Sequence, residues 1–221
     1  MIMAGKRKLA VSLLVVAGLA ACGNDKADTG GSPLMVAGQA AKGMIAQARG
    51  SKAEAAAPAR TPEQMAAEAL SVNPGPLVMI GFENLSRTQV MAMTGQNRNM
   101  RTYMAPSKEG VILRDGMLVG TRGLGNDLSV AESSTERLIR AGQSGQGQRT
   151  LRIYSGDGTE RPLTFDCTVG PGPNKGVVVE SCQGHGASFQ NSYMPQGGQI
   201  PVSRQWAGPK MGYLTIQTLR P

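Results

Sequence analysis

Few side chains in this sequence could carry out catalysis. It holds a single histidine, His185, which lies between two glycines. A zinc site needs two or three more ligands at suitable spacing, and a serine hydrolase of the common type needs a Gly-x-Ser-x-Gly elbow, but neither pattern is present. The 15 acidic residues leave a carboxylate-pair glycan hydrolase open as an alternative. The sequence therefore favours a protein that is not an enzyme and holds no metal.

Cys22 is a nucleophile in a recognisable chemical context. Lys6-Arg7-Lys8 precede an uncharged, largely apolar run from Leu9 to Ala21, which ends in small residues before the thiol. The run is shorter than the roughly 20 residues of a membrane-spanning helix and has the length of a signal-peptide core. The arrangement resembles the lipobox of bacterial lipoproteins, although an ordinary signal peptide with a chance cysteine is the alternative. We expect residues 1–21 to be removed and Cys22 to carry diacylglycerol and palmitate, with no other cofactor.

The residue after Cys22 bears on the membrane that the chain reaches. Gly23 stands where aspartate would resemble an inner-membrane retention signal. Its presence favours lipid anchoring in the outer membrane, with the protein facing the periplasm.

The two remaining cysteines are expected to form a disulfide. Cys167 lies in a segment of alternating apolar and polar residues, Leu163 to Val169, and Cys182 ends a second strand-like segment, Val177 to Cys182. The turn-rich residues 170–176 connect them, so an antiparallel hairpin would place the two thiols opposite each other. The periplasm is oxidising, which favours the bond. A redox-active pair is the alternative, but such pairs usually lie close together at a helix start.

The chain is basic. Its net charge is +8, and residues 1–21 hold three basic and no acidic residues, which leaves +5 for the mature part. Nucleic acid is not expected as a partner, because no block of Lys and Arg alternates with aromatic residues. An anionic polysaccharide or lipid head group is a candidate partner, and the alternative is that the charges only solvate the surface. The candidate glycan-binding side chains are Arg114, Arg122, Arg152 and Arg161.

The first part of the mature chain contains linkers and short helices. Residues 23–33 have the composition of a flexible tether, 34–49 of a short helix and 50–60 of an Ala-rich linker. Thr61-Pro62-Glu63-Gln64 has the pattern of a capping box and predicts a helix that runs to about Leu70. We therefore divide the chain into a signal peptide (1–21), a lipidated tether with a short helix (22–60) and a β-rich periplasmic domain (61–221).

The pattern of the remaining sequence predicts many short strands separated by turns. The predicted strands are 77–82, 88–94, 98–104, 111–113, 117–119, 150–154, 163–169, 177–182, 199–206 and 211–219. Asp115-Gly116 between two apolar runs predicts a tight hairpin. A short helix is expected over 133–140 and a mobile loop over 142–147. The expected fold is mainly β, an antiparallel barrel or sandwich with one or two short N-terminal helices.

Four segments together resemble a known family. They are the lipobox, Pro74-Gly75-Pro76-Leu77, the block from Asp115 to Leu128 that contains Thr-Arg-Gly-Leu-Gly, and the C-terminal segment from Trp206 to Pro221. The chain resembles the YjbF family, the group 4 capsule (GfcB, YmcC) lipoproteins, over roughly residues 70–221. The resemblance implies an all-β, barrel-like periplasmic domain, a setting of exopolysaccharide or capsule production, and outer-membrane partners. It implies no catalytic residues.

These observations support a non-catalytic accessory lipoprotein in exopolysaccharide or capsule secretion or assembly. The partners would be the membrane, through the lipid anchor, and outer-membrane β-barrel or polysaccharide-export proteins, with an anionic polysaccharide as a further candidate. The alternatives are a structural envelope lipoprotein that stabilises an outer-membrane protein complex, and a glycan hydrolase.

Overall fold

The computed structural model describes residues 60–154 and 157–221. The expected signal peptide, Cys22, the tether and the helix over 34–49 lie outside these residues. In the part that is described, no helix is long and apolar enough to cross a membrane.

Strands dominate the described domain. The helical elements are α2 (Pro62–Val72), the short 3-10 helix η1 (Glu83–Leu85) and α3 (Glu136–Ala141). The strands are β1 (Leu77–Phe82), β2 (Arg87–Asn97), β3 (Met100–Met104), β4 (Gly110–Arg114), β5 (Met117–Arg122), β6 (Leu128–Ser133), β7 (Gly145–Tyr154), β8 (Glu160–Pro171), β9 (Val178–Gly184), β10 (Ala187–Gln196), β11 (Gln199–Trp206) and β12 (Tyr213–Arg220).

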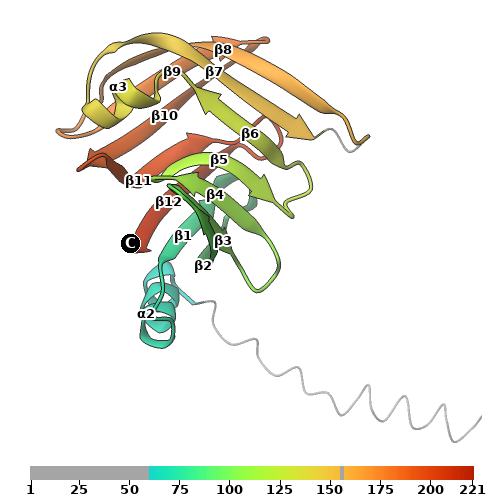
Figure 1. The fold of residues 1–221 in the computed structure, drawn as a ribbon, viewed down its shortest axis with the longest axis vertical. Helices are drawn as coiled ribbons and strands as arrows, with labels where there is room; N and C mark the ends of the chain where they lie inside the picture. The colour runs from blue at the N-terminus through green and yellow to red at the C-terminus, as the bar shows by residue number, and fades with distance from the viewer. Residues whose placement is uncertain (1–59, 155–156) are drawn as a thin grey trace, which may run out of the picture. The chain divides into compact units, whose positions relative to one another are not determined.

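All twelve strands belong to one antiparallel sheet in the order β5-β4-β3-β2-β1-β12-β11-β10-β9-β8-β7-β6. Strands that follow each other in the chain pair with each other, except for β5 and β6, which form the two edges of the sheet. The first and last strands, β1 and β12, also pair. In Figure 1, strands β6–β10 lie on one side of the domain and β1–β5 on the other, with β11 and β12 between them. The mainly β, antiparallel fold predicted from the sequence is confirmed, and it is a nearly closed barrel.

The two edge strands meet at a seam that side chains bridge. The two strands come close at Gly120 of β5, where an added Cβ atom would lie 3.3 Å from the Leu128 carbonyl oxygen of β6. Across the seam, the Leu128 N–H of β6 donates to the Thr121 hydroxyl of β5 at 2.9 Å. The Leu118 N–H, also in β5, donates to Gln205 Oε1 of β11 at 3.0 Å. Side chains therefore satisfy backbone groups that an open sheet edge would leave unpaired.

The predicted Asp115-Gly116 hairpin joins β4 and β5. Both residues have positive φ, 48° and 86°, as the tightest hairpin turns require. The Ile200 N–H donates to the Asp115 carbonyl at 3.0 Å, so this turn contacts the start of β11. A Cβ atom on Gly116 would lie 2.0 Å from the Ile200 carbonyl oxygen, which leaves room for glycine alone.

Helix α2 begins where the capping pattern predicts. The Gln64 N–H donates to the Thr61 hydroxyl at 3.3 Å, and the Thr61 N–H donates to Gln64 Oε1 at 3.0 Å. At the other end of the helix, Arg220 of β12 donates to the carbonyl of Leu70 at 3.0 Å and to that of Asn73. These bonds satisfy helix carbonyls that have no partner inside the helix and attach α2 to the sheet.

The inward-facing side chains form two apolar clusters. The larger one fills the barrel interior and includes Ile80, Phe82, Leu151 and Phe165, which are almost fully buried. The smaller one includes Ile139 of α3, so this short helix contributes to the core.

The expected mobile loop over 142–147 is wrong in its second half, because Gly145 and Gly147 belong to β7. Added Cβ atoms there would lie 2.6 Å from Leu138 of α3 and 2.4 Å from the Ser134 hydroxyl. The glycines are thus needed for close packing between the strand and the α3 region. From the sequence alone, glycines with this role look the same as glycines in a flexible loop. Strands β6 and β10 were not predicted.

Candidate functional site

Strands β7–β10 carry an ordered set of polar side chains on the outer surface of the barrel. The strand register aligns them in two rows that cross all four strands. One row consists of Gln148, Asp166, Gln183 and Ser188, and the other of Gln146, Thr168, Ser181 and Gln190. These eight residues are called the polar face below.

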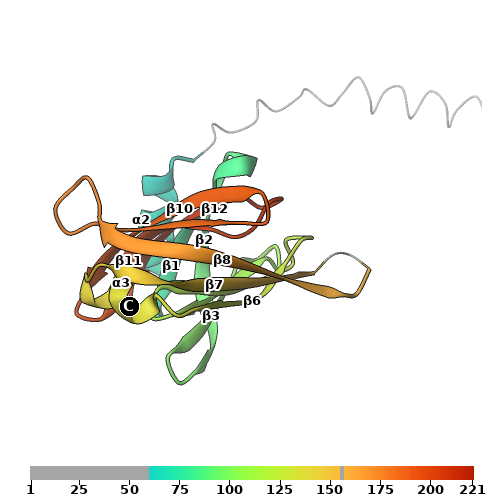
Figure 2. The same cartoon turned by 90° about the horizontal axis from the view of Figure 1, so that it is seen from above.

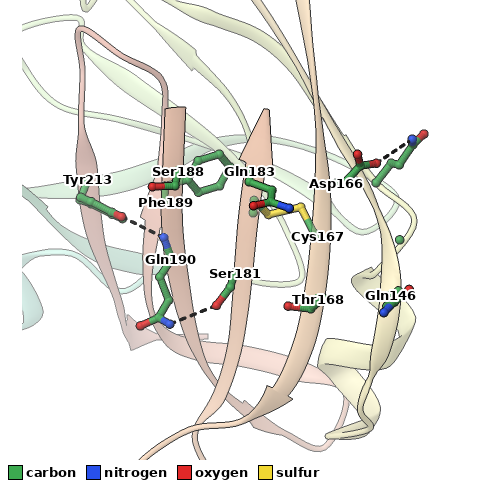
Figure 3. A pocket seen from close by; sticks show the side chains of 13 residues that line it. Gln146, Asp166, Cys167, Thr168, Ser181, Gln183, Ser188, Phe189, Gln190 and Tyr213 are labelled. Atoms are coloured by element: carbon green, nitrogen blue, oxygen red, sulfur yellow. Dashed lines mark hydrogen bonds between the residues drawn. A yellow bond between two sulfur atoms is a disulfide. The ribbon is translucent and has the colours of Figure 1, made fainter. Parts of the chain in front are cut away.

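The polar face lines a broad, open hollow of about 1000 Å³, shown in Figure 3. Two hydrogen bonds link neighbouring members: Gln148 Nε2 donates to Asp166 at 3.0 Å, and Gln190 Nε2 donates to the Ser181 hydroxyl at 3.1 Å. The Tyr213 hydroxyl accepts the Gln190 N–H at 3.0 Å at the border of the hollow. Asp166 is the one ionisable member of the eight.

The alternation of the strands decides which residues reach this face. Successive side chains of a strand point to opposite sides of the sheet, and the residues between the two polar rows are Gly147, Cys167, Cys182 and Phe189, which are aligned across the same four strands. Cys167, Cys182 and Phe189 are buried. The two polar rows are therefore backed by a packed layer.

Cys167 and Cys182 are joined by a disulfide in this layer, as we expected from the sequence. They face each other directly across β8 and β9. Together with Glu180 they form the one group of potential metal ligands that lie close together in the described residues. Because both sulfurs belong to the disulfide, they offer no thiolate to a metal ion.

A buried ion pair lies next to the disulfide. Glu180 is fully buried, and its carboxylate accepts bonds from Arg149 Nε at 3.0 Å, the Tyr193 hydroxyl at 2.9 Å, Asn191 Nδ2 at 2.9 Å and the Thr135 hydroxyl at 2.5 Å. Arg149 Nη2 lies 2.8 Å from Glu180 Oε2. The carboxylate thus has a positive charge and several donors around it, which is the condition under which a buried charge is stable.

The pKa values reflect this arrangement. Burial disfavours the charged form of Glu180, but the Arg149 charge and the donated hydrogen bonds outweigh it, so the pKa of Glu180 lies below its usual value. Burial raises the pKa of Tyr193 far above its usual value, so the phenol stays protonated and remains a donor. No group in this cluster is poised to exchange a proton near neutral pH, which suits a structural role better than acid–base catalysis.

His185 has a local structural contact. It lies in the turn between β9 and β10 with a φ of 50°, and its Nε2 accepts the backbone N–H of Thr164 at 3.1 Å. Its ring also meets the edge of Phe165 at a centroid distance of 5.6 Å.

Arg114 and Arg122, two of the four candidate glycan-binding arginines, lie at opposite ends of the β4–β5 hairpin. Arg114 is paired with Glu136 of α3 at 2.5 Å. Arg140 also binds Glu136 and donates to the Arg114 carbonyl at 2.7 Å. Arg114 is therefore engaged in attaching α3 to the hairpin. Arg122 donates to the neighbouring carbonyl of Thr121 at 2.6 Å.

Arg152 and Arg161 lie on neighbouring strands but on different sides of the sheet. Arg161 is aligned with Ile153, so the preceding residue Arg152 points to the other side. Arg161 is exposed and binds Asp157 at 3.1 Å. The structure does not bring the four arginines together into one basic groove.

Sequence reasoning missed the polar face. Its signal is the alternation of Gln and Ser with small or apolar residues in segments 145–148 and 187–190. The composition of residues 142–147 predicts a loop, and residues 187–192 carry no strand prediction. The alignment of the four strands, which the sequence does not show, makes these residues a continuous surface.

Known proteins share this architecture. The profile of the family described as "Group 4 capsule polysaccharide lipoprotein gfcB, YjbF" matches residues 50–219. No curated protein matches the sequence. The structure is similar to the crystal structure of the hypothetical lipoprotein YmcC from Escherichia coli K12, with a TM-score of 0.59 over 71% of this chain and 89% of that chain. The two chains are 14% identical, so this similarity concerns the fold.

Proposed function

We propose a function that proceeds from one premise: this chain belongs to the YjbF family of group 4 capsule polysaccharide lipoproteins. The proposed function is that of a lipid-anchored, non-catalytic accessory protein in the secretion or assembly of an extracellular polysaccharide. The family match over most of the chain carries this proposal. The polar face supports it, because it is a large hydrogen-bonding surface without a catalytic arrangement among its residues.

The proposed anchor is lipid on Cys22. Residues 1–21 have the charge, apolar length and small residues of a lipoprotein signal, and several acyl chains bind a bilayer far more firmly than one. Gly23 after the cysteine favours the outer membrane, where the domain would face the periplasm and the polysaccharide-export proteins of that membrane.

The proposed role is not catalytic. Glycoside hydrolysis generally needs two carboxylates about 5–10 Å apart that flank the scissile bond. The polar face offers a single carboxylate, Asp166, which Gln148 already engages. The carboxylate of the buried Glu180 is enclosed by donors from Arg149, Asn191 and Tyr193, none of which belongs to the polar face. A zymogram with the purified protein on the cell's own polysaccharide should stay blank, and a cleared band would contradict this part of the proposal.

A deletion strain tests the accessory function. Secreted polysaccharide is measured without the gene and after complementation with the wild-type chain or with Cys22→Ala at matched protein levels. We expect the deletion to lower the secreted polymer and only the wild type to restore it. Unchanged polymer in the deletion strain would refute the accessory function, and full restoration by Cys22→Ala would refute the need for an anchor.

A second candidate function is the stabilisation of an outer-membrane protein complex. One observation favours it: Met194 and Val202 face each other on β10 and β11, and both are exposed. With Met79 and Val177 they line a second hollow of about 410 Å³ on the barrel surface. Crosslinking in intact cells from position 202 should trap a membrane protein if this function holds, and the deletion should then destabilise that protein without a change in polysaccharide.

A further inference from the structure

We propose that the polar face binds an uncharged, hydroxyl-rich stretch of a polysaccharide chain that lies across strands β7–β10. The inference rests on the proposed function, since it names the ligand and the surface through which the accessory protein would act. It replaces the basic groove expected from the sequence with a different surface and a different chemistry.

The side chains of the polar face match sugar hydroxyls. A glutamine amide offers two donors and an acceptor with two lone pairs, and a serine or threonine hydroxyl both donates and accepts. Sugar hydroxyls likewise donate and accept, so each sugar can pair with either type of side chain. Four of the eight residues are glutamines and three carry hydroxyls. The one charge in this set is the carboxylate of Asp166, so the surface has no cation with which to attract an anionic polymer.

The spacing of the polar face also suits a polymer. Neighbouring strands lie about 4.8 Å apart, and outward-facing residues of one strand follow each other at about 6.6 Å. The length of a hexose unit is of the same order as the strand spacing. A glycan that crosses the strands would therefore meet a new pair of polar side chains with each successive sugar, along the hollow of about 1000 Å³.

Four of the eight side chains of the polar face are held in place before any ligand arrives. The bond from Gln148 to Asp166 and the bond from Gln190 to Ser181 fix two pairs of side chains, each of which retains free donors or acceptors. The Cys167–Cys182 disulfide lies directly behind the two rows. A surface with restricted side chains loses less conformational entropy on binding, which favours weak hydrogen-bonding ligands.

The same surface fits a protein or an anionic polymer poorly. Protein interfaces are anchored by buried aromatic or large apolar side chains, and the exposed large apolar side chains of the described residues all lie outside the polar face. An anionic polymer would meet the carboxylate of Asp166 and no cation within the two rows. An uncharged glycan is the ligand class that the composition favours.

The test uses the full lipidated chain in detergent micelles and affinity electrophoresis, which detects weak binding. The probe is the cell's own exopolysaccharide, before and after chemical reduction of its carboxyl groups to neutral sugars. The test variant is Gln146→Ala with Gln183→Ala, which removes one exposed amide from each row. The matched control is Arg152→Ala, which removes a charge from the same outward face of β7 beyond the polar rows.

We expect the wild type to bind both forms of the polymer with a Kd on the order of 0.1–1 mM, because each hydrogen bond contributes little net free energy in water. Binding should change less than about threefold between low and high salt, since surface charges are the groups that salt screens. The double variant should bind roughly tenfold more weakly, and Arg152→Ala should bind like the wild type.

The proposal would be overturned if the wild type did not bind or if the double variant bound as well as the wild type. It would also be overturned if carboxyl reduction of the polymer, or Arg152→Ala in the protein, abolished binding. The last result would assign recognition to charge. The deletion strain keeps the accessory function separate, because a loss of secreted polymer there combined with no binding here would refute the polar face alone.

Discussion

Replacing Glu180 by glutamine tests whether the buried ion pair stabilises the barrel. The carboxylate accepts hydrogen bonds from Arg149, Tyr193, Asn191 and Thr135, all of which are buried. Glutamine keeps the size of the side chain but removes its charge, and its amide nitrogen is a donor among donors. The variant therefore leaves the Arg149 guanidinium buried without a counterion.

The expected loss is large. Removing one partner of a buried ion pair destabilises a protein by about 3–5 kcal/mol, because the remaining charge is uncompensated. The side chain of Arg149 is only 3% exposed, so water cannot replace the lost carboxylate without local opening. Since domains are stable by about 5–15 kcal/mol in total, Glu180→Gln should fold but unfold at much lower urea concentration.

The double variant Glu180→Gln with Arg149→Met sharpens the test. Once both charges are gone, no buried charge lacks a partner. The double variant should therefore lose at least about 2 kcal/mol less stability than the sum of the two single losses. Arg149→Met alone leaves the Glu180 carboxylate buried without its cation, which raises its pKa. The folded state then binds more protons than the unfolded state, so this single variant should gain stability as the pH falls from 7 toward 5.

Urea unfolding of the disulfide-bonded protein measures these effects. Trp206, the one tryptophan of the chain, stacks on Phe189 at a centroid distance of 4.3 Å and reports the packing of the same strands by fluorescence. The control is Glu132→Gln, an exposed acidic residue on β6, which should change stability by less than about 0.5 kcal/mol. A loss below about 1 kcal/mol for Glu180→Gln, or strictly additive single losses, would refute the reasoning.

Three further predictions concern other parts of the barrel. Replacing Cys167 and Cys182 by serine should lower stability by about 3 kcal/mol, because the disulfide closes a loop with a sequence separation of 15; an unchanged urea midpoint would contradict this. Gly116→Ala should destabilise by about 1–3 kcal/mol more than Gly125→Ala, since both glycines have positive φ but only the first contacts a backbone carbonyl of β11; equal losses in thermal unfolding would show that this close contact does not matter. The pKa of Glu109 is lowered to about 2, chiefly by the hydrogen bonds from Arg87, so its contribution to the stability of the fold is present above about pH 4.5 and is lost as the pH falls toward 2. The difference in unfolding free energy between wild type and Glu109→Gln should therefore shrink between pH 5 and pH 2.5, and a constant difference would refute the assignment.

The parts of the fold that were predicted well have local signals. Leu77–Phe82 is a continuous apolar run bounded by turn residues, and it coincides with β1. The capping pattern at Thr61 placed the start of α2, and Asp115-Gly116 placed the β4–β5 hairpin. In each case a few neighbouring residues are sufficient to specify the backbone, so no knowledge of the tertiary structure is needed.

The parts that were missed depend on tertiary contacts. Strand β10 carries Ser, Gln and Asn, which have weak strand preference, and its buried Asn191 is stable only because Glu180 and the Trp206 backbone N–H pair with it. Gly145 and Gly147 have loop composition but are required by the packing of the α3 region against β7. The polar face depends on the relative register of four strands, which is set by the whole barrel.

The seam between β5 and β6 has a consequence for how the domain folds. These two strands follow each other in the chain, yet they form the two edges of the sheet, while the first and last strands of the domain pair with each other (Figures 1 and 2). The fold is thus a circularly permuted meander. Two runs of local hairpins, β1–β5 and β6–β12, need a single long-range pairing between Leu77–Phe82 and Tyr213–Arg220 to become one sheet. Loop-closure entropy makes such a pairing the slow step, so a variant chain cut at the seam and joined between β12 and β1 should fold faster and reach the same barrel.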